Sequence, residues 1–460
     1  MPALNRPRIV IAGTNSGVGK TTIVTGLLAY LHSVGFSVQP FKVGPDYIDP
    51  GFHGLAAGRN SYNLDTWMSP AEHLVSNFAY LSEGADISIV EGVMGLYDGG
   101  ANGISSTADI AKRLKAPVIL VLDCKSVGYS IAATALGFRE YDPGIQIAGV
   151  ILNRLGSDRH EAMVREVMDK IHMPVIGAFH RDEGLKTPER HLGLTPVTEI
   201  ETSNLIHHMG EDAGKWVDTE KLMEIARSAP PIPVMEEKDI NIKKYVRIGV
   251  ARDAAFSFYY PASLHALEKL GAELVDFSPV TDKSVPDVDG LVFGGGFPEM
   301  FLNELEGNIS MKDSIHIAAE DGMPVYAECG GLMYLCDKIQ GFDGHQYEMA
   351  GLVPGICEMQ KTLQRVGYVT GKALRKSIIA DQGDILKGHE FHFSLLRCDD
   401  QFPWAYDLQG TRQAAPHQEG YAYENVLASY LHLSFEGNPE AARKFLKSCE
   451  DYKTRKSGGK

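Results

Sequence analysis

A chain of 460 residues is longer than one typical domain and fits two or three domains, each large enough to bury a hydrophobic core of its own. Its 44% hydrophobic and 22% charged residues are typical of a water-soluble globular protein, its apolar runs are too short to span a membrane, and its net charge of -15 argues against nucleic-acid binding. The six cysteines have no paired spacing and no leader-like segment opens the chain, so we expect a cytoplasmic protein without a disulfide framework or a zinc site.

The first half of the chain alternates short apolar runs with longer helical patterns. The runs are continuous and rich in Ile and Val, as in parallel strands that are buried on both faces, and they are RIVIAG (8–13), ISIVEG (87–92), PVILVLD (117–123) and IAGVILN (147–153). Helical patterns cover residues 21–33 and 105–114. This alternation predicts a doubly wound α/β fold with a mostly parallel sheet.

A glycine-containing loop between the first strand and the first helix has the pattern of a phosphate loop, T14-N-S-G-V-G-K-T21. Glycines at such positions let backbone N–H groups approach phosphate oxygens, a lysine supplies charge, and a hydroxyl reaches Mg²⁺. The strict pattern has Gly where this chain has Thr14, but the flanking strand and helix favour a nucleotide site over a simple turn. The candidate ATP contacts are Thr14, Gly17, Gly19, Lys20, Thr21 and Thr22.

Carboxylates gather at the ends of the next strands, where ligands bind in open α/β sheets. Lys42, Asp46 and Asp49 lie in a Pro/Gly turn, Glu91 ends a buried strand, and Asp98 follows in a glycine-rich loop. Each turn alone fits a solvated loop equally well. Together with the phosphate loop, however, Thr21, Asp46 and Glu91 become candidate Mg²⁺ ligands.

One further polar residue, Asn153, lies at the end of the strand 147–153. It is positioned either to read the edge of an adenine or only to end its strand, and the sequence leaves both open.

The strand and helix pattern breaks at a proline-rich stretch and then starts again. Residues 230–245 combine three prolines with the charged run MEEKDINIKK, which predicts a linker between an ATP-binding domain (1–229) and a second α/β domain (246–460). The second series begins with VRIGVA (246–251). The C-terminal tail (454–460) is expected to fray.

In the second half, Cys329 stands between the strand PVYAE and a helical pattern that opens with Gly330 and Gly331. A nucleophile on a sharp strand-to-helix turn needs small neighbours, and the helix N-terminus favours its thiolate. Backbone N–H groups of Gly295, Gly296 and Gly330 are candidates for stabilising an oxyanion, and His432 is the candidate base, as in a Cys-His catalytic pair. Taken alone, Cys329 would more often be a buried core cysteine.

These motifs resemble the cobyrinic acid a,c-diamide synthase family, in which a dethiobiotin-synthetase-like ATPase is fused to a class I glutamine amidotransferase domain. The resemblance covers nearly the whole chain and rests on KVGPDYIDPGFH (42–53), LDTWM (64–68), EGVMGLYDG (91–99), GGGFPE (294–299), AECGGLMYL (327–335), GHEFHFS (388–394) and ASYLHLSF (428–435). The usual H-x-E pattern of the amidotransferases is broken by Ser434, and Glu436 has the wrong spacing, so the third member of the catalytic set is unassigned.

The resemblance implies a ligase that phosphorylates side-chain carboxylates of cobyrinate with ATP and replaces the phosphate by ammonia from L-glutamine. It assigns Lys20, Thr21, Asp46 and Glu91 to ATP and Mg²⁺, and Cys329 and His432 to glutamine hydrolysis. It further assigns catalysis near the macrocycle to Asp98, and substrate contacts to Lys42, Tyr47 and Ile48.

Two rival interpretations stay open at this point. Enzymes with the same motifs amidate nickel sirohydrochlorin, and a protein of another class would use the nucleotide as a switch and its C-terminal half as a non-catalytic binding module. Asn15 and Ser16, which stand where partitioning ATPases have a signature lysine, argue against the second rival. The sequence does not show whether two copies form a homodimer.

Overall fold

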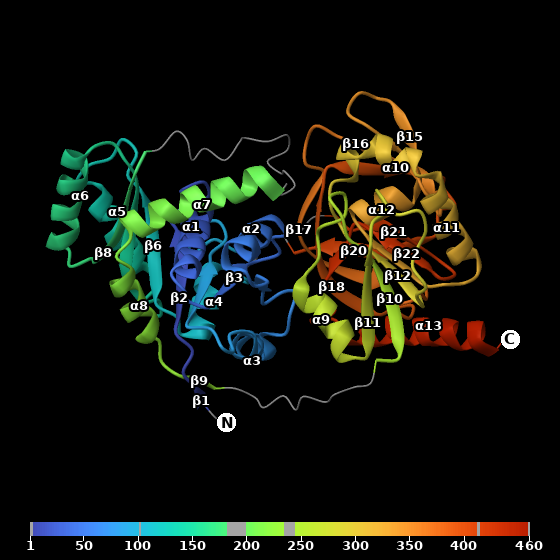
Figure 1. Ribbon diagram of the computed structural model, residues 1–460, viewed down its shortest axis with the longest axis horizontal. Helices are drawn as coiled ribbons and strands as arrows, with labels where there is room; N and C mark the ends of the chain where they lie inside the picture. The colour runs from blue at the N-terminus through green and yellow to red at the C-terminus, as the bar shows by residue number, and fades with distance from the viewer. Residues whose placement is uncertain (1–2, 101–102, 182–198, 234–243, 412–414, 459–460) are drawn as a thin grey trace. The chain divides into compact units, whose positions relative to one another are not determined.

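The computed structural model describes residues 3–100, 103–181, 199–233, 244–411 and 415–458. These fall into an N-terminal unit, Met1–Thr66 with Pro70–Glu237, and a C-terminal unit, Trp67–Ser69 with Lys238–Lys460 (Figure 1). Most of the predicted linker, 234–243, lies outside the described residues.

The N-terminal unit is built on a seven-stranded sheet in which every pairing is parallel. The strands, in spatial order, are β4 (Tyr62–Leu64), β3 (Val38–Val43), β5 (Ile87–Glu91), β2 (Arg8–Gly13), β6 (Val118–Asp123), β7 (Ile147–Leu155) and β8 (Val175–His180). The predicted parallel sheet is confirmed. Because β2 lies between β5 and β6, the loops at its carboxyl end open at the point where the strand order reverses, which is where ligands bind in such folds.

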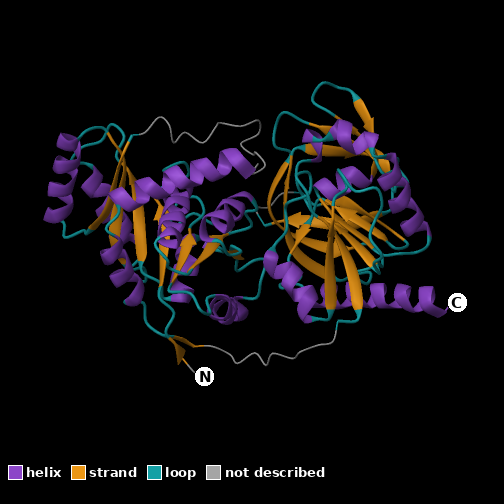
Figure 2. Ribbon diagram, viewed as in Figure 1, coloured by secondary structure: helices purple, strands orange, loops and turns teal. Residues whose placement is uncertain are grey.

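Helices cover both faces of this sheet, as the alternation of strand side chains requires (Figure 2). Ile9 and Ile11 of β2 face a core that is completed by α1 (Lys20–Ser33), α2 (Ile48–Ala57), α7 (Glu199–Trp216) and α8 (Thr219–Arg227). Val10 and Ala12 face the opposite core, which is formed with α3 (Ala71–Leu81), α4 (Thr107–Leu114), α5 (Ile131–Tyr141) and α6 (Asp158–Lys170). A short antiparallel pair joins β1 (Ala3–Leu4) to β9 (Ile232–Pro233).

A fully buried arginine at the start of β2 ties distant parts of the N-terminal unit together. The guanidinium of Arg8 donates to the carbonyl oxygens of Leu114 (2.6 Å), Arg6 (2.8 Å) and Pro230 (2.6 Å). Burial lowers the pKa of Arg8 to about 10, which still leaves the side chain charged at neutral pH. It therefore joins β2 to the end of α4 and to the segment that leaves the domain.

We expect Arg8→Met to destabilise the N-terminal unit by about 3 kcal/mol, because it leaves buried carbonyl groups without a donor while nearly preserving side-chain volume. Chemical denaturation with a probe in this unit measures the loss. Arg159→Met, at an exposed position of α6, is the matched control and should change stability by less than about 0.5 kcal/mol. An equal, small effect of both substitutions would contradict a structural role for Arg8.

The C-terminal unit contains a ten-stranded sheet whose first part is parallel and whose second part is antiparallel. The parallel strands are β11 (Ala272–Phe277), β10 (Val246–Ala251), β12 (Gly290–Phe293), β13 (Val325–Glu328) and β22 (Val426–Ser429). The antiparallel strands that follow are β21 (His417–Tyr423), β20 (Trp404–Gly410), β17 (Arg365–Ala373), β18 (Ile385–His392) and β23 (His432–Leu433). Only two residues separate β22 from β23, so the antiparallel part curls back toward β13.

Helices again cover both faces. On one face lie α9 (Pro261–Lys269) and α13 (Pro439–Gly458), and on the other lie α10 (Leu302–Gly307), α11 (Ile309–Glu320) and α12 (Gly330–Leu335), preceded by a 3₁₀ turn at Pro298–Met300. A second sheet orders β15 (Gln346–Glu348), β14 (Cys336–Gln340), β16 (Val353–Met359) and β19 (Ser394–Arg397). The predicted α/β fold is thus confirmed for both halves.

The prediction that the tail frays from residue 454 is wrong for its described part. Helix α13 continues to Gly458. Arg455 donates to the carbonyl oxygen of Gly322, and Lys456 pairs with Asp287 at 2.8 Å, so side-chain contacts hold the last turns.

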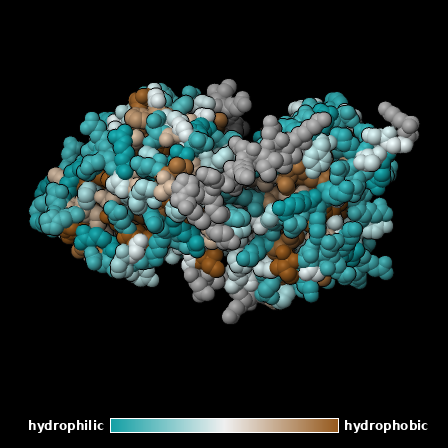
Figure 3. Space-filling model, turned by 90° about the horizontal axis from the view of Figure 1, so that it is seen from below, coloured by the Kyte–Doolittle hydropathy of each residue, from teal (hydrophilic) through white to brown (hydrophobic). Residues whose placement is uncertain are grey.

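Hydrophilic residues cover most of the face drawn in Figure 3. Among the described helices, none has the length and apolarity needed to cross a membrane.

Candidate functional site

The phosphate loop connects β2 to α1 with the backbone conformations that only its glycines adopt easily. Gly17 and Gly19 have φ angles of 79° and 95°, and a Cβ atom on Gly19 would lie 2.3 Å from the Nδ2 atom of Asn153. Gly19 precedes α1 without a side-chain cap, which leaves the N–H groups of the first turn available to phosphate oxygens. Lys20 is buried and donates to the carbonyl oxygens of Met94 (2.6 Å) and Asn15 (3.3 Å), and burial lowers its pKa.

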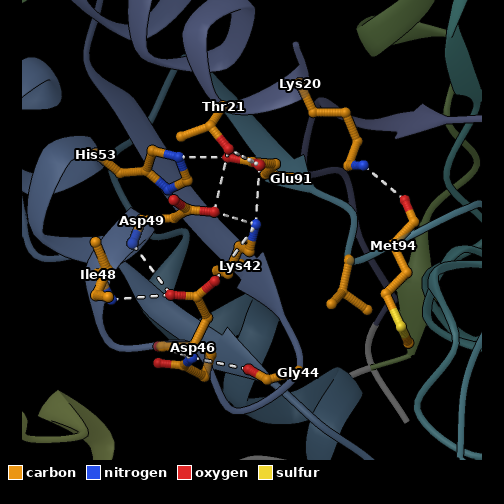
Figure 4. A network of polar contacts seen from close by, with 12 residues as sticks. Lys20, Thr21, Lys42, Gly44, Asp46, Ile48, Asp49, His53, Glu91 and Met94 are labelled. Atoms are coloured by element: carbon orange, nitrogen blue, oxygen red, sulfur yellow. Dashed lines mark hydrogen bonds and ion pairs between the residues drawn. The ribbon is translucent and has the colours of Figure 1, made fainter. Parts of the chain in front are cut away.

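A network of charged side chains lies next to this loop (Figure 4). At its centre is Glu91, fully buried at the end of β5. One carboxylate oxygen of Glu91 accepts hydrogen bonds from the Lys42 ammonium and from the Thr21 hydroxyl, each at 2.8 Å, and the other lies 2.7 Å from Nε2 of His53. Burial alone would raise the pKa of Glu91, but the Lys42 charge and the His53 contact hold it well below its usual range. Glu91 is therefore ionised at neutral pH.

Two aspartates at the start of α2 complete the network. Asp49 lies 2.5 Å from the Lys42 ammonium and 3.2 Å from the Thr21 hydroxyl. Asp46 accepts hydrogen bonds from the backbone N–H groups of Ile48 and Asp49 and lies 3.8 Å from Lys42. Burial and the charge of Asp46 raise the pKa of Asp49 to about 6. Sequence reasoning placed Asp49 in this turn but assigned it no role, and it gave none to His53, because only the fold brings both to Thr21 and Glu91.

Among the residues that the structure describes, no cluster of three or more His, Cys, Asp or Glu side chains is arranged to hold a metal ion. A magnesium site beside a nucleotide does not need such a cluster, because one or two carboxylates, waters and the phosphates usually supply its ligands. The Thr21 hydroxyl, with Glu91 at 2.8 Å and Asp49 at 3.2 Å, presents oxygen atoms of the kind that Mg²⁺ prefers. This side-chain set fits Mg²⁺.

Most of the candidate nucleotide residues line one cavity of about 1320 Å³ in the N-terminal unit. Its lining includes the predicted residues Gly17, Gly19, Lys20, Thr21, Thr22, Lys42, Asp46, Glu91 and Asn153. Four other residues predicted in the N-terminal half, all within the described ranges, are not in this lining: Thr14, Tyr47, Ile48 and Asp98. Tyr47 and Ile48 begin α2, and Asp98 accepts a hydrogen bond from the backbone N–H of Gly95 in its own loop.

Asn153 supports the phosphate loop. Its amide donates to the carbonyl oxygen of Val18 at 2.7 Å and its own oxygen accepts from the N–H of Arg154. Arg154, which has a φ angle of 61°, donates to the carbonyl oxygen of Gly17 and pairs with Asp123 at 2.6 Å. The sequence gave no signal for the role of Arg154. Its contact with Gly17 spans more than a hundred residues of the chain, and its contact with Asp123 joins two different strands.

In the C-terminal unit, Cys329 has the strained backbone of a nucleophile elbow. It follows β13 and precedes α12 with φ 47° and ψ −102°, a conformation that is costly for a residue with a side chain. A Cβ atom on Gly331 would lie 2.5 Å from the carbonyl oxygen of Phe293, so the turn requires a glycine there. Burial raises the pKa of the Cys329 thiol well above its usual range, so the resting thiol is neutral. A base must remove its proton before it attacks.

The predicted oxyanion loop and the predicted base lie against this elbow. A Cβ atom on Gly330 would lie 3.0 Å from the backbone nitrogen of Gly296, and one on Gly295 would lie 3.0 Å from Cε1 of His432. Gly296 itself has a φ angle of 158°, and a Cβ atom there would collide with the carbonyl oxygen of Ala255. Three segments that the sequence separates by up to 137 positions (295 to 432) therefore meet within van der Waals distance.

The imidazole of His432 is buried between two side chains. Its ring stacks on His389 with 4.9 Å between ring centroids, and its Nδ1 atom lies 3.2 Å from a carboxylate oxygen of Glu328. Burial and the neighbouring His432 lower the pKa of His389 well below its usual value, so His389 is neutral at physiological pH. Sequence reasoning missed Glu328, which lies 104 residues from His432 and does not have the expected spacing.

Comparisons with known proteins agree with this two-site arrangement. Residues 9–194 match the model of the CobQ/CobB/MinD/ParA nucleotide binding domain, and residues 247–440 match the CobB/CobQ-like glutamine amidotransferase domain. A cobyrinate a,c-diamide synthase of Dehalococcoides mccartyi (strain CBDB1) is 45% identical to this chain. The similarity covers 98% of this chain and 100% of that enzyme. Enzymes of the same name from Archaeoglobus fulgidus (43% identical, 96% of this chain, 97% of that protein) and Priestia megaterium (42%, 97% and 98%) are also similar.

Proposed function

This chain belongs to the cobyrinate a,c-diamide synthase family of glutamine-hydrolysing ligases, and from that premise we propose that it converts the a- and c-side-chain carboxylates of cobyrinate to amides. Full-length similarity to enzymes of that name is the observation that carries the proposal. It also decides against the non-catalytic switch, because the similarity spans both units. We place the enzyme in the cytoplasm, where ATP and glutamine are available.

The N-terminal unit activates the carboxylate. Hydroxide is a poor leaving group and phosphate a good one, so transfer of the γ-phosphoryl group of ATP to the carboxylate makes it reactive toward ammonia. In our proposal Gly17, Gly19 and Lys20 hold the phosphates, and Thr21, Glu91 and Asp46, joined by Asp49, hold Mg²⁺. Mg²⁺, when bound, neutralises charge on the phosphate oxygens.

We assign the Lys42 ammonium to the substrate side of the same reaction. It lies among Asp49, Glu91 and Asp46, and those carboxylates outweigh the effect of its burial and raise its pKa, so it stays charged. A fixed positive charge there stabilises both an incoming carboxylate and the charge of the transferring phosphoryl group. We assign Tyr47, Ile48 and Asp98 to the region of the macrocycle by resemblance.

The C-terminal unit produces ammonia. The Cys329 sulfur attacks the side-chain carbonyl carbon of glutamine while His432 takes the thiol proton, and the oxyanion is stabilised by N–H groups of Gly295, Gly296 and Gly330. Collapse of this intermediate releases ammonia with the proton returned by His432, and water then hydrolyses the thioester to glutamate. Ammonia displaces phosphate from the activated carboxylate and forms the amide.

The substrate is tested by mass spectrometry of parallel incubations with cobyrinate and nickel sirohydrochlorin, each with ATP, Mg²⁺ and glutamine. We expect two amide groups to form on cobyrinate and none without ATP. Amide formation on nickel sirohydrochlorin alone would contradict the assignment to cobyrinate, and an unchanged mass of both would contradict the amidation of either macrocycle.

A further inference from the structure

We infer that Glu328, the residue immediately before the nucleophile, is the carboxylate that orients His432 for glutamine hydrolysis. The inference rests on the roles proposed above for Cys329 and His432. It supplies the third member of the catalytic set from a position that the H-x-E pattern does not predict, at the end of β13 and not two residues after the histidine.

The contact between the two side chains is buried and direct. One carboxylate oxygen of Glu328 lies 3.2 Å from Nδ1 of His432, and the two residues are only 8% and 2% exposed. An ionised carboxylate that accepts a hydrogen bond from Nδ1–H fixes the tautomer whose Nε2 atom carries a free electron pair. The imidazole then has its basic nitrogen available for a thiol proton, and the carboxylate stabilises the imidazolium that forms.

The carboxylate is itself held in place. Its second oxygen accepts hydrogen bonds from the Tyr326 hydroxyl at 2.5 Å and from the backbone N–H of Leu433 at 3.1 Å. Tyr326 lies two residues earlier on β13, so both side chains point to the same face of the sheet. Leu433 follows the histidine directly. A carboxylate with two fixed donors on one oxygen and the imidazole on the other has little freedom to rotate.

The position where class I amidotransferases usually carry their glutamate has a different task in this chain. Ser434 is buried, and its hydroxyl accepts a hydrogen bond from the backbone N–H of Gly437 at 3.3 Å, which closes the turn before α13. The curl of the sheet brings β23 back beside β13, and Glu328 reaches the imidazole from there. The same chemical partner is thus supplied by a different strand.

The test is Glu328→Gln in the full-length enzyme, with Glu436→Gln as the matched control because Glu436 is the other carboxylate close to His432 in the sequence. We expect glutamine-dependent kcat to fall roughly a hundredfold or more in Glu328→Gln while KM for glutamine changes little, because the amide can impose the wrong tautomer without blocking substrate. Amidation supported by ammonium salts should stay at the native level, and Glu328→Asp should recover part of the lost kcat. Glu436→Gln should behave as the native enzyme.

Each outcome supports or overturns either the inference on Glu328 or the proposed function. Native-like glutamine-dependent kcat in Glu328→Gln overturns the inference, and so does equal loss of ammonium-supported amidation, which would mean that Glu328 serves folding. A native enzyme that does not hydrolyse glutamine, or a Cys329→Ser variant that still does, would instead overturn the proposed function. The two failures are therefore distinguishable.

Discussion

Replacing Cys329 by serine is expected to lower glutamine-supported amidation by at least about a thousandfold and to leave ammonium-supported amidation intact. The serine hydroxyl is a far weaker nucleophile than a thiolate, and the strained elbow backbone at this position persists because Gly330 and Gly331 set it. In the proposed mechanism external ammonia bypasses the lost step, because the N-terminal unit would need only ammonia and not glutamine. The measurement is amide formation with each nitrogen source at saturating ATP.

Cys398→Ser is the matched control, since Cys398 lies in the same unit, is partly exposed and has no place in the proposed chemistry. It should keep both activities. Glutamine-supported amidation that survives in Cys329→Ser would show that another residue supplies the nucleophile, and loss of both activities would show that the cysteine is needed for more than ammonia production.

Replacing Glu91 by glutamine is expected to lower amidation roughly a hundredfold or more with either nitrogen source. The substitution removes the negative charge that anchors Lys42 and contacts His53, and in our proposal it removes an Mg²⁺ ligand next to Thr21. Glu91→Gln leaves the buried Lys42 ammonium without one of its counter-charges. It should therefore also lower the free energy of unfolding of the N-terminal unit by about 3 kcal/mol. Glutamine hydrolysis at Cys329 should persist.

Thr21→Val separates chemistry from stability in this site. It removes only the hydroxyl that lies 2.8 Å from Glu91 and leaves the charges of the network in place. It should lower amidation and raise the Mg²⁺ concentration needed for half-maximal rate, with little change in thermal unfolding. Glu166→Gln, at an exposed position of α6, is the control. Native-like amidation in both Glu91→Gln and Thr21→Val would contradict the assignment of this network to ATP and Mg²⁺.

Much of the fold could be predicted because its signals are local. The runs RIVIAG and VRIGVA coincide with β2 and β10, since a strand buried on both faces must be continuously apolar. The helix predicted for residues 21–33 begins one residue earlier in the structure. The antiparallel strands β17, β20 and β21 were not predicted, because half-exposed strands such as β17 carry polar residues and have no continuous apolar run.

The sites were predictable where a motif carries its own geometry. The phosphate loop and the elbow at Cys329 are short segments whose glycines fix the backbone, so the sequence contains them whole. Contacts between distant segments were not predictable. His53 meets Glu91 across 38 residues, which depends on strand order, and Glu328 meets His432 across 104, which depends on the curl of a sheet.

We propose that this enzyme amidates cobyrinate by first phosphorylating its carboxylates, and the fate of the carboxylate oxygen reveals whether it does. Cobyrinate with isotopically heavy oxygen in its side-chain carboxylates is incubated with the native enzyme, ATP, Mg²⁺ and glutamine, and product and phosphate are analysed by mass spectrometry. We expect a diamide that has lost one heavy oxygen from each of two carboxylates, with each lost atom recovered in inorganic phosphate. Amide formation with phosphate free of heavy oxygen, or no amide at all, would contradict it.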